Sequence, residues 1–303
     1  MAISRPTTTA ELHEALGMLL EREGLSAGEV RDHVQTLVRY TRRRGLSLNQ
    51  CMVAREGGRL VTSCLFIDAP GRMSTVFLPS RARFLKPPET IARLLRQTTP
   101  MARDRGVRVV QGLVAPAAAM ERSVFEQAGY TFLAELIYLE SDLAKPVLTD
   151  KHPPILEWET YEPGKRQRFG QILQGTYVES QDCAKLTGVR PIDEILDSHF
   201  AAGEFDPNDW RIGVLDGEPA GILLLAYLAE RAVFEVVYMG VLPVYRSRGV
   251  GTGLLTKAVE LGRERGVMTL TLTVDAVNAP ARKLYAAFGF HETSRREVWI
   301  QVL

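Results

Sequence analysis

The sequence predicts an α/β protein built from two tandem domains, each a mixed β-sheet with flanking helices. The chain has 303 residues, about twice the length that one domain commonly needs. Its second half alternates strand-like and helix-like segments in an order that mixes antiparallel hairpins with one crossover helix. The two halves also share short motifs at a constant spacing, which indicates a duplicated unit.

The second half, residues 155–303, shows the clearer series of elements, in the order β-α-α-β-β-β-α-β-α-β. Alternating apolar residues mark the strands, and a 3.6-residue apolar period marks the helices. Asp216-Gly217 is a hairpin turn signal, and Gly266 ends the longest helix. The expected strands cover 156–161, 210–215, 220–228, 232–241, 268–274 and 290–302, and the expected helices 165–177, 191–200, 251–265 and 280–288.

The first half, residues 1–144, repeats this order more loosely. No opening strand is recognised in it. The expected helices cover 9–20, 27–44, 89–105 and 118–127, and the expected strands 51–55, 60–67, 74–78, 107–114 and 132–140.

Residues 145–154 are predicted to be the linker between the two domains, because they contain three prolines and mixed charge and show neither a helical nor a strand period of apolar residues. Matching motifs lie on both sides of it. The segment 104–107, Asp-Arg-Gly-Val, matches Glu-Arg-Gly-Val at 264–267, and 127–130 matches 287–290, both at an offset of 160 residues. An unchanged offset indicates duplication.

Composition excludes several classes of protein. With 46% hydrophobic and 24% charged residues the chain has enough apolar material for real cores, and a net charge of +1 does not favour a nucleic-acid binder. No apolar run reaches the roughly 18 residues of a membrane span, and the first residues lack a signal-peptide pattern. Three cysteines outside any metal-ligand spacing predict neither disulfides nor a metal site. We expect a cytoplasmic protein without membrane contacts.

The stretch 239–253 carries a signal for anion binding. An apolar strand ends, Pro243 breaks it, and three glycines open a helix whose unpaired N–H groups suit a phosphate or pyrophosphate. A P-loop is excluded because no lysine stands at the required place, and a dinucleotide fingerprint is excluded because Leu254 replaces its third glycine. The pattern that fits is Arg-x-x-Gly-x-Gly, with Arg246, Gly249 and Gly251.

A second motif follows further along the chain. Asn278 precedes a short helix with Tyr285 seven positions later, and Gly289-Phe290 leads into the next strand. Alone, Asn278 would be an ordinary N-cap and Tyr285 an ordinary core residue. Both motifs in this order resemble the GNAT superfamily of N-acyltransferases, and the resemblance covers residues 155–303.

The resemblance implies a site for acetyl-CoA as the donor substrate, with no metal. Tyr285 would lie near the thioester sulfur, and Asn278 would contact the cofactor. The pantetheine arm would bond the backbone of Met239, Gly240 and Val241. The residues implied for the pyrophosphate are Arg246, Ser247, Arg248, Gly249, Val250, Gly251 and Thr252.

Glu235 and Tyr285 are the predicted catalytic pair. A carboxylate inside the apolar strand 232–241 must be paired, protonated or functional. Counting in twos from Glu235 places it on the same face as Val241, which would flank the thioester, although a β-bulge would break this parity. Glu235 would accept the amine proton, and Tyr285 would protonate the leaving thiolate.

The first half departs from the family pattern at the residues that carry chemistry. The segment 86–93 stands in the place of 246–253 and has no glycine, while Ala118 and Phe125 stand in the places of Asn278 and Tyr285. We therefore interpret residues 1–144 as a degenerate GNAT-like copy, kept for packing or to wall the acceptor site.

The resulting prediction is an N-acetyltransferase that moves an acetyl group from acetyl-CoA to a primary amine by direct attack. The acceptor is a small-molecule or peptide amine, and a monomer is expected because a tandem chain can supply its own pairing. Glu179 and Asp182 in the segment 177–190 could pair with an ammonium and Arg190 with a carboxylate, or all three could be solvated loop residues. Two alternatives stay open: a covalent acyl-enzyme on Cys183, and a non-catalytic acyl-CoA sensor or scaffold.

Overall fold

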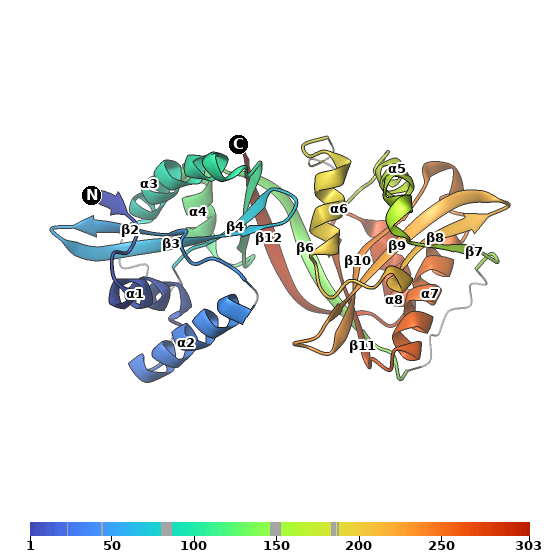
Figure 1. Ribbon diagram of the computed structural model, residues 1–303, viewed down its shortest axis with the longest axis horizontal. Coiled ribbons are helices and arrows are strands. Elements are labelled where there is room, and N and C mark those ends of the chain that lie inside the picture. Colours follow the sequence, from blue (N-terminus) through green and yellow to red (C-terminus); the bar gives the residue numbers. More distant parts are fainter. Residues whose placement is uncertain (23, 44, 80–86, 146–152, 183–185, 187) are drawn as a thin grey trace. The chain divides into compact units, whose positions relative to one another are not determined.

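The computed structural model describes residues 1–22, 24–43, 45–79, 87–145, 153–182, 186 and 188–303. It divides into two compact units. Unit 1 comprises Met1–Leu133 together with Glu297–Leu303, and unit 2 comprises Ala134–Arg296. Each unit is a mixed sheet with helices on both faces (Figure 1), which confirms the predicted fold class.

Unit 1 holds a six-strand sheet in which β4 and β5 are parallel and the other neighbours are antiparallel. Its strand order is β1 (Ala2–Ser4), β2 (Cys51–Glu56), β3 (Arg59–Ala69), β4 (Met73–Phe77), β5 (Val109–Val114) and the end of β12 (His291–Val302). One face packs on α1 (Thr9–Leu20) and α2 (Ala27–Arg43), and the other on α3 (Pro88–Thr98) and α4 (Ala119–Gln127) (Figure 1).

Unit 2 repeats the plan, with β10 and β11 as its parallel pair. Its strand order is β7 (Glu157–Thr160), β8 (Trp210–Leu215), β9 (Glu218–Leu228), β10 (Val233–Val241), β11 (Thr269–Asp275) and β6 (Thr131–Asp142). Helices α5 (Arg166–Thr176) and α6 (Ile192–Phe200) cover one face around the buried Trp210. Helices α7 (Val250–Glu264) and α8 (Ala279–Ala287) cover the other.

The units exchange strands at their edges. Residues 134–142 of β6 are the last strand segment of the first half of the sequence but belong to unit 2, where residues 136–142 pair with β11. Residues 297–302 of β12 close the second half but pair with β5 in unit 1. The predicted domain limits, 1–144 and 155–303, describe the duplicated halves and stay a prediction, and residues 146–152 of the predicted linker lie outside the described residues.

The duplication is visible in matching local geometry. Gly106 and Gly266 both adopt positive φ, 81° and 74°, where a helical segment ends, and each donates its N–H three residues back. The ring pair Phe125–Tyr130 in unit 1 corresponds to Tyr285–Phe290 in unit 2 at the same offset of 160. Equal spacing in sequence therefore corresponds to equal packing.

The predicted elements agree with the structure apart from two differences. The opening strand that was not recognised is β1, which is too short to show an alternating pattern. The helix predicted over 89–105 is α-helical only to Thr98 and continues as a 3-10 helix over Thr99–Arg105, because Pro100 cannot continue the α-helical hydrogen bonding. The Asp216-Gly217 turn has positive φ at both residues, 54° and 82°, as a tight hairpin requires.

Two features are absent from the described part of the chain. It contains no helix that is both long and apolar enough to cross a membrane. Nor does it contain a group of three or more His, Cys, Asp or Glu arranged to hold a metal ion.

The position of β6 predicts that the second half is not self-sufficient. A fragment of residues 155–303 lacks β6, which exposes the edge of β11 and removes Ile137 and Leu143 from the core of unit 2. Burying such a side chain stabilises a fold by about 1.5–3 kcal/mol, and a free sheet edge promotes association. We expect this fragment to self-associate and bind a hydrophobic dye, and a fragment of residues 134–303 to do so less. Light scattering measures the self-association, and the fluorescence of the dye measures the exposed apolar surface. A soluble, monomeric 155–303 fragment would contradict the prediction.

Candidate active site

The central feature of unit 2 is an opening between β10 and β11. The two strands pair at only three positions, the last being Val236 with Leu272. Beyond it β10 continues beside β9 to Val241, and β11 continues beside β6 to Asp275. A cavity of about 720 Å³ occupies the gap, lined by both strands, α7, α8 and the segment after α5. The facing strand edges have no ladder partner among the described residues, so a ligand can bond their backbone.

The glycine turn lies at this cavity, as the sequence predicts. Ser247 and Gly249 have positive φ, 61° and 81°, and α7 begins at Val250 without a side-chain cap. Its first-turn N–H groups are therefore open to an anion. A Cβ at Gly251 would lie 3.3 Å from Cδ2 of Leu284, which shows how closely backbone and α8 approach.

Arg246 has a different environment from the one that the pyrophosphate assignment implies. Its guanidinium donates to the carbonyl oxygens of Thr176 (3.0 Å), Val178 (2.6 Å), Glu179 (3.2 Å) and Val241 (3.3 Å). Arg246 therefore ties the end of α5 and the segment after it to the end of β10.

Arg248 is the more accessible arginine of the turn. It is half-exposed, 3.6 Å from the Asp216 carboxylate, and its guanidinium lies 5.2 Å from the ring centroid of Tyr245. It also lines the cavity, so it remains available to a bound anion.

The residues predicted on α8 also line the cavity. The Asn278 side chain accepts from the Ala281 N–H at 3.3 Å and so caps the helix. Tyr285 is 7% exposed, and burial raises the pKa of its phenol well above the usual value, with Asp182 and Tyr238 acting in the same direction. The phenol is therefore protonated at neutral pH and can donate a proton.

The parity argument for Glu235 is wrong. The pairing of β10 with β9 shifts register between Val236 and Tyr238, so Val237 is an extra residue in a β-bulge. Val241 packs with the α7 and α8 core, whereas Tyr238 packs with the α5 and α6 core. Glu235 therefore shares its face with Tyr238 and not with Val241. Burial raises the pKa of its carboxyl, which the positive charge of Arg231 partly offsets.

The segment after α5 supplies two carboxylates to the cavity, Asp182 and Glu179, both of which the sequence predicts as residues for an ammonium or as solvated loop residues. Asp182 accepts a hydrogen bond from the Asp275 backbone N–H at 3.3 Å, and burial raises its pKa. Glu179 also lines the cavity. Arg190 donates to Ser198 Oγ at 2.8 Å and does not line it. Cys183 lies outside the described residues.

Tyr238 is a cavity residue that sequence reasoning missed. Its hydroxyl lies 2.7 Å from Thr176 Oγ1, and burial raises its pKa. Counting in twos placed Tyr238 on the other face, so only the position of the bulge could have identified it.

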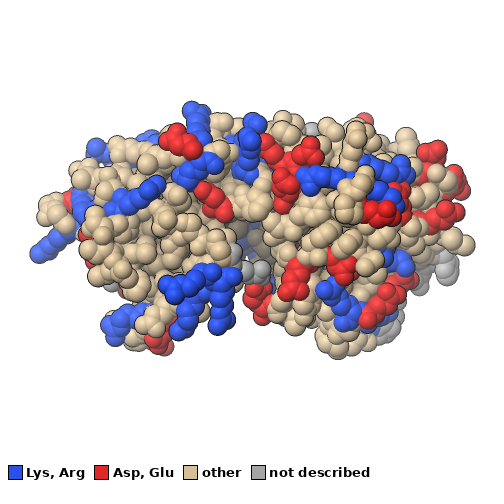
Figure 2. Space-filling model, viewed as in Figure 1, with Lys and Arg blue, Asp and Glu red and all other residues tan. Residues whose placement is uncertain are grey.

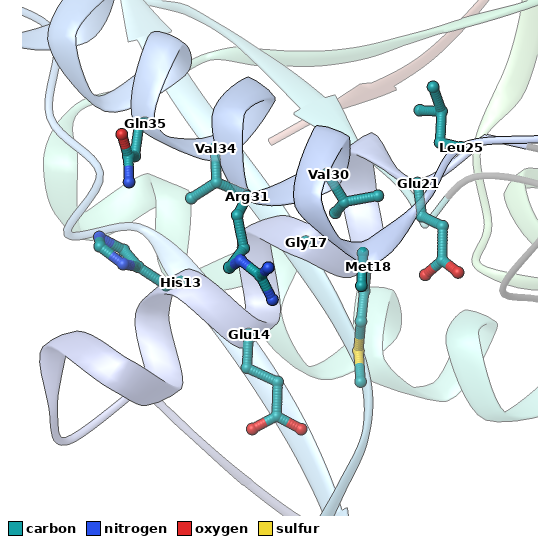
Figure 3. Close-up of a pocket in the computed structure, with 11 residues that line it drawn as sticks. His13, Glu14, Gly17, Met18, Glu21, Leu25, Val30, Arg31, Val34 and Gln35 are labelled. Atoms are coloured by element: carbon teal, nitrogen blue, oxygen red, sulfur yellow. The ribbon is translucent and has the colours of Figure 1, made fainter.

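Unit 1 has a cavity of another kind. About 490 Å³ lies between α1 and α2, lined by His13, Glu14 and Met18 from one helix and Arg31 and Gln35 from the other (Figure 3). None of the residues that line it belongs to an Arg-x-x-Gly-x-Gly pattern, in keeping with the missing donor motif of the first half. On the face shown in Figure 2, side chains of both charge signs occur on both units.

Residues 178–290 match the family model described as "Acetyltransferase (GNAT) family". The match includes the glycine turn, the opening of the sheet and α8.

Three relatives carry acetyltransferase names. Mycothiol acetyltransferase of Thermobifida fusca is 25% identical over 296 residues, 84% of this chain and 84% of the relative. Mycothiol acetyltransferase of Streptomyces griseus is 29% identical over 150 residues, 49% of this chain and 46% of the relative. Streptothricin acetyltransferase of Streptomyces lavendulae is 37% identical over 75 residues, 25% of this chain and 40% of the relative. The chain thus spans less than half the length of two of them.

Two solved structures share the fold along nearly the whole chain. A GCN5-related N-acetyltransferase from Sphaerobacter thermophilus aligns with a TM-score of 0.65 and 18% identity, covering 99% of this chain and 95% of that one. A tandem GNAT protein from the clavulanic acid biosynthesis pathway aligns with a TM-score of 0.53 and 15% identity, covering 99% and 98%. These alignments confirm the tandem arrangement of the fold.

The contacts of Arg246 predict a structural role for this side chain. Hydrogen bonds from a charged donor each contribute about 1.5–3 kcal/mol, so we expect Arg246→Gln to lower the free energy of unfolding by about 2–3 kcal/mol. Arg248→Gln is the matched control, since an exposed ion pair contributes about 1 kcal/mol or less. Urea unfolding followed by tryptophan fluorescence measures both, because Trp210 is buried in unit 2. Equal losses in the two variants would contradict the assignment.

Proposed function

We propose that the protein is an acyl-CoA-dependent N-acetyltransferase that moves an acetyl group from acetyl-CoA to a primary amine, with one donor site, in unit 2. One observation carries this proposal: the opening between β10 and β11 has the uncapped start of α7 at its border and Tyr285 in its wall. Relatives named for mycothiol and streptothricin favour a small-molecule amine as the acceptor. The protein would act as a monomer.

In this proposal the donor lies along the free edge of β10. The pantetheine amides would bond the backbone of Met239, Gly240 and Val241, like an added strand. The pyrophosphate would be held by the amides of residues 247–252, with Arg248 beside it. Asn278 would contact the cofactor from the start of α8.

The chemistry needs a base and an acid on different sides of the thioester. The amine attacks as the free base, so the C–N bond forms as Glu235 accepts the amine proton, directly or through water, and the C–S bond breaks as Tyr285 protonates the thiolate. Glu235 lies on the α5 and α6 face of the sheet, whereas Tyr285 reaches the cavity from the α7 and α8 face. This arrangement supports proton acceptance on the side of the entering amine and proton donation on the side of the leaving sulfur.

The assay that tests the function is thiol release from acetyl-CoA with a panel of primary amines. Release that depends on the amine, with the acetylated amine identified by mass spectrometry, supports the transferase. Tight acetyl-CoA binding without release under any amine would instead support a non-catalytic acyl-CoA sensor.

The donor site is tested by Gly251→Trp. The small space between residue 251 and Leu284 excludes an indole, so we expect acetyl-CoA affinity to fall by at least about tenfold, since the ring blocks approach to the amides. Gly164→Trp is the control, because no atom lies within 4 Å of a Cβ built there. Calorimetry that finds unchanged affinity in Gly251→Trp would place the donor elsewhere.

The base is tested by the pH dependence of Glu235→Gln. A base must be unprotonated, so kcat/KM of the wild type declines as the pH falls through the raised pKa of Glu235. We expect Glu235→Gln to lower kcat by at least about tenfold and to remove this acidic limb. An unchanged acidic limb would exclude Glu235 as the base.

The acid is tested by Tyr285→Phe, which removes the hydroxyl and keeps the ring that packs 5.8 Å from the Phe290 centroid. We expect kcat to fall by at least about tenfold with acetyl-CoA affinity nearly unchanged. Tyr227→Phe, outside the cavity on β9, is the matched control. Full kcat in Tyr285→Phe would remove the acid role.

A further inference from the structure

A polar surface adjoins the apex of the donor cavity on one face of the unit 2 sheet. The register pairs Glu235 with Thr271 on β11, and β11 in turn pairs with β6. The opposite face of the same strands is apolar and buried under α7 and α8. The side chains that share the polar face are Glu235, Thr271, Thr273, Tyr138 and Glu140.

This surface meets the cavity at the point where β10 and β11 separate. The last paired position is Val236 with Leu272, so Glu235 stands one residue before the opening and Thr273 one residue after it. Thr273 lines the cavity and pairs directly across the strands with Tyr138. Tyr138 therefore lies beside the cavity on the face of the sheet that carries Glu235.

Arg296 adds a cation to this surface and has no acidic partner among the described residues. Its neighbour Arg295 is bound to Glu135 on the opposite face of the sheet, and side chains alternate along β12, so Arg296 lies on the Tyr138 face. It is half-buried, and its one described hydrogen bond goes to the Arg295 carbonyl oxygen at 2.6 Å. Among the described residues no carboxylate lies within ion-pair distance of it. Its neighbour Arg295 is paired with Glu135 at 2.8 Å and with Glu292 at 2.6 Å.

The charges of Arg296 and Glu235 both affect the pKa of the Tyr138 phenol. Burial raises the pKa of Tyr138, the positive charge of Arg296 lowers it, and the negative charge of Glu235 raises it. Tyr138 is therefore near a cation and an anion that do not pair with each other. A partly buried guanidinium without an anion is unfavourable, and an anionic ligand would offset that cost.

We infer that the acceptor is a primary amine bearing an anionic group, a carboxylate or a phosphate, which binds Arg296 while the amine faces Glu235. The Tyr138 hydroxyl donates a hydrogen bond to the same anionic group. This inference rests on the proposed transferase function, and it names the class of acceptor. Guanidinium groups bind carboxylate and phosphate oxygens through paired N–H donors, so one residue serves either group.

The experiment compares matched amines that differ in one anionic group: β-alanine with propylamine, phosphoethanolamine with ethanolamine, and glucosamine 6-phosphate with glucosamine. We expect wild-type kcat/KM to be at least tenfold higher for the anionic member of one or more pairs. Arg296→Gln should raise KM at least tenfold for that member and leave the neutral amine unchanged, and Arg296→Lys should keep part of the preference. Arg295→Gln is the control one residue away.

The inference would be overturned if wild-type kcat/KM were equal for both members of every pair. It would also be overturned if Arg296→Gln lowered kcat/KM equally for both members of a pair. Either result would leave the transferase function intact. Absence of thiol release with every amine would count against the function. The inference is then judged by calorimetric titration of the same amines into the CoA-saturated protein. Weaker binding of anionic amines to Arg296→Gln than to Arg295→Gln supports it, and no binding to the wild type or equal binding to both variants overturns it.

Discussion

The separation of β10 from β11 after Val236 and Leu272 is the constraint on which the rest of unit 2 depends. Backbone groups on a strand edge require partners, and here they border a cavity instead of another strand. The bulge at Val237 turns the following side chains over, so Tyr238 joins the α5 and α6 face while Val241 joins the α7 and α8 face. An opening through a sheet gives a ligand access to both faces at once. In the proposed function, the base would act on the entering amine and the acid on the leaving sulfur from opposite faces of the sheet.

The two halves share a fold but differ at the residues that stand in the place of the candidate site. In unit 1 the helix corresponding to α7 begins after Pro87, and its N-cap is not a glycine. Phe125 stands in the place of Tyr285, is 2% exposed and fills the space that a Cβ at Gly112 would need. A buried aromatic ring stabilises the core and excludes a ligand from the same space. Fold and chemistry are therefore separable within this one chain.

Local signals predicted most of the fold and the position of the donor turn. Amphipathic periods and glycine stops marked the elements, and the turn around Gly249 lies at the cavity as its spacing implied. Three features could not be predicted, because each depends on contacts distant in sequence. A bulge adds one residue without any signal in the composition, so the prediction that Glu235 shares a face with Val241 was wrong. The direction of Arg246 depends on carbonyls about 70 residues away, and a strand pattern does not reveal that β6 pairs with β11.

The exchange of strands gives the first half of the sequence a structural role in unit 2, although this half lacks the donor motif. Residues 134–142 form the edge of the unit 2 sheet, and Ile137 belongs to its core, so loss of the first half would leave β11 as an open edge. The same strand brings Tyr138 beside Thr273 at the apex of the cavity. Substitutions on β6 can therefore change the surface next to Glu235 without touching the glycine turn, which lies on the second half of the chain. In the proposed function, such a division would let the amine side of the site diverge while the donor side stays constant, and strand exchange would supply its structural basis.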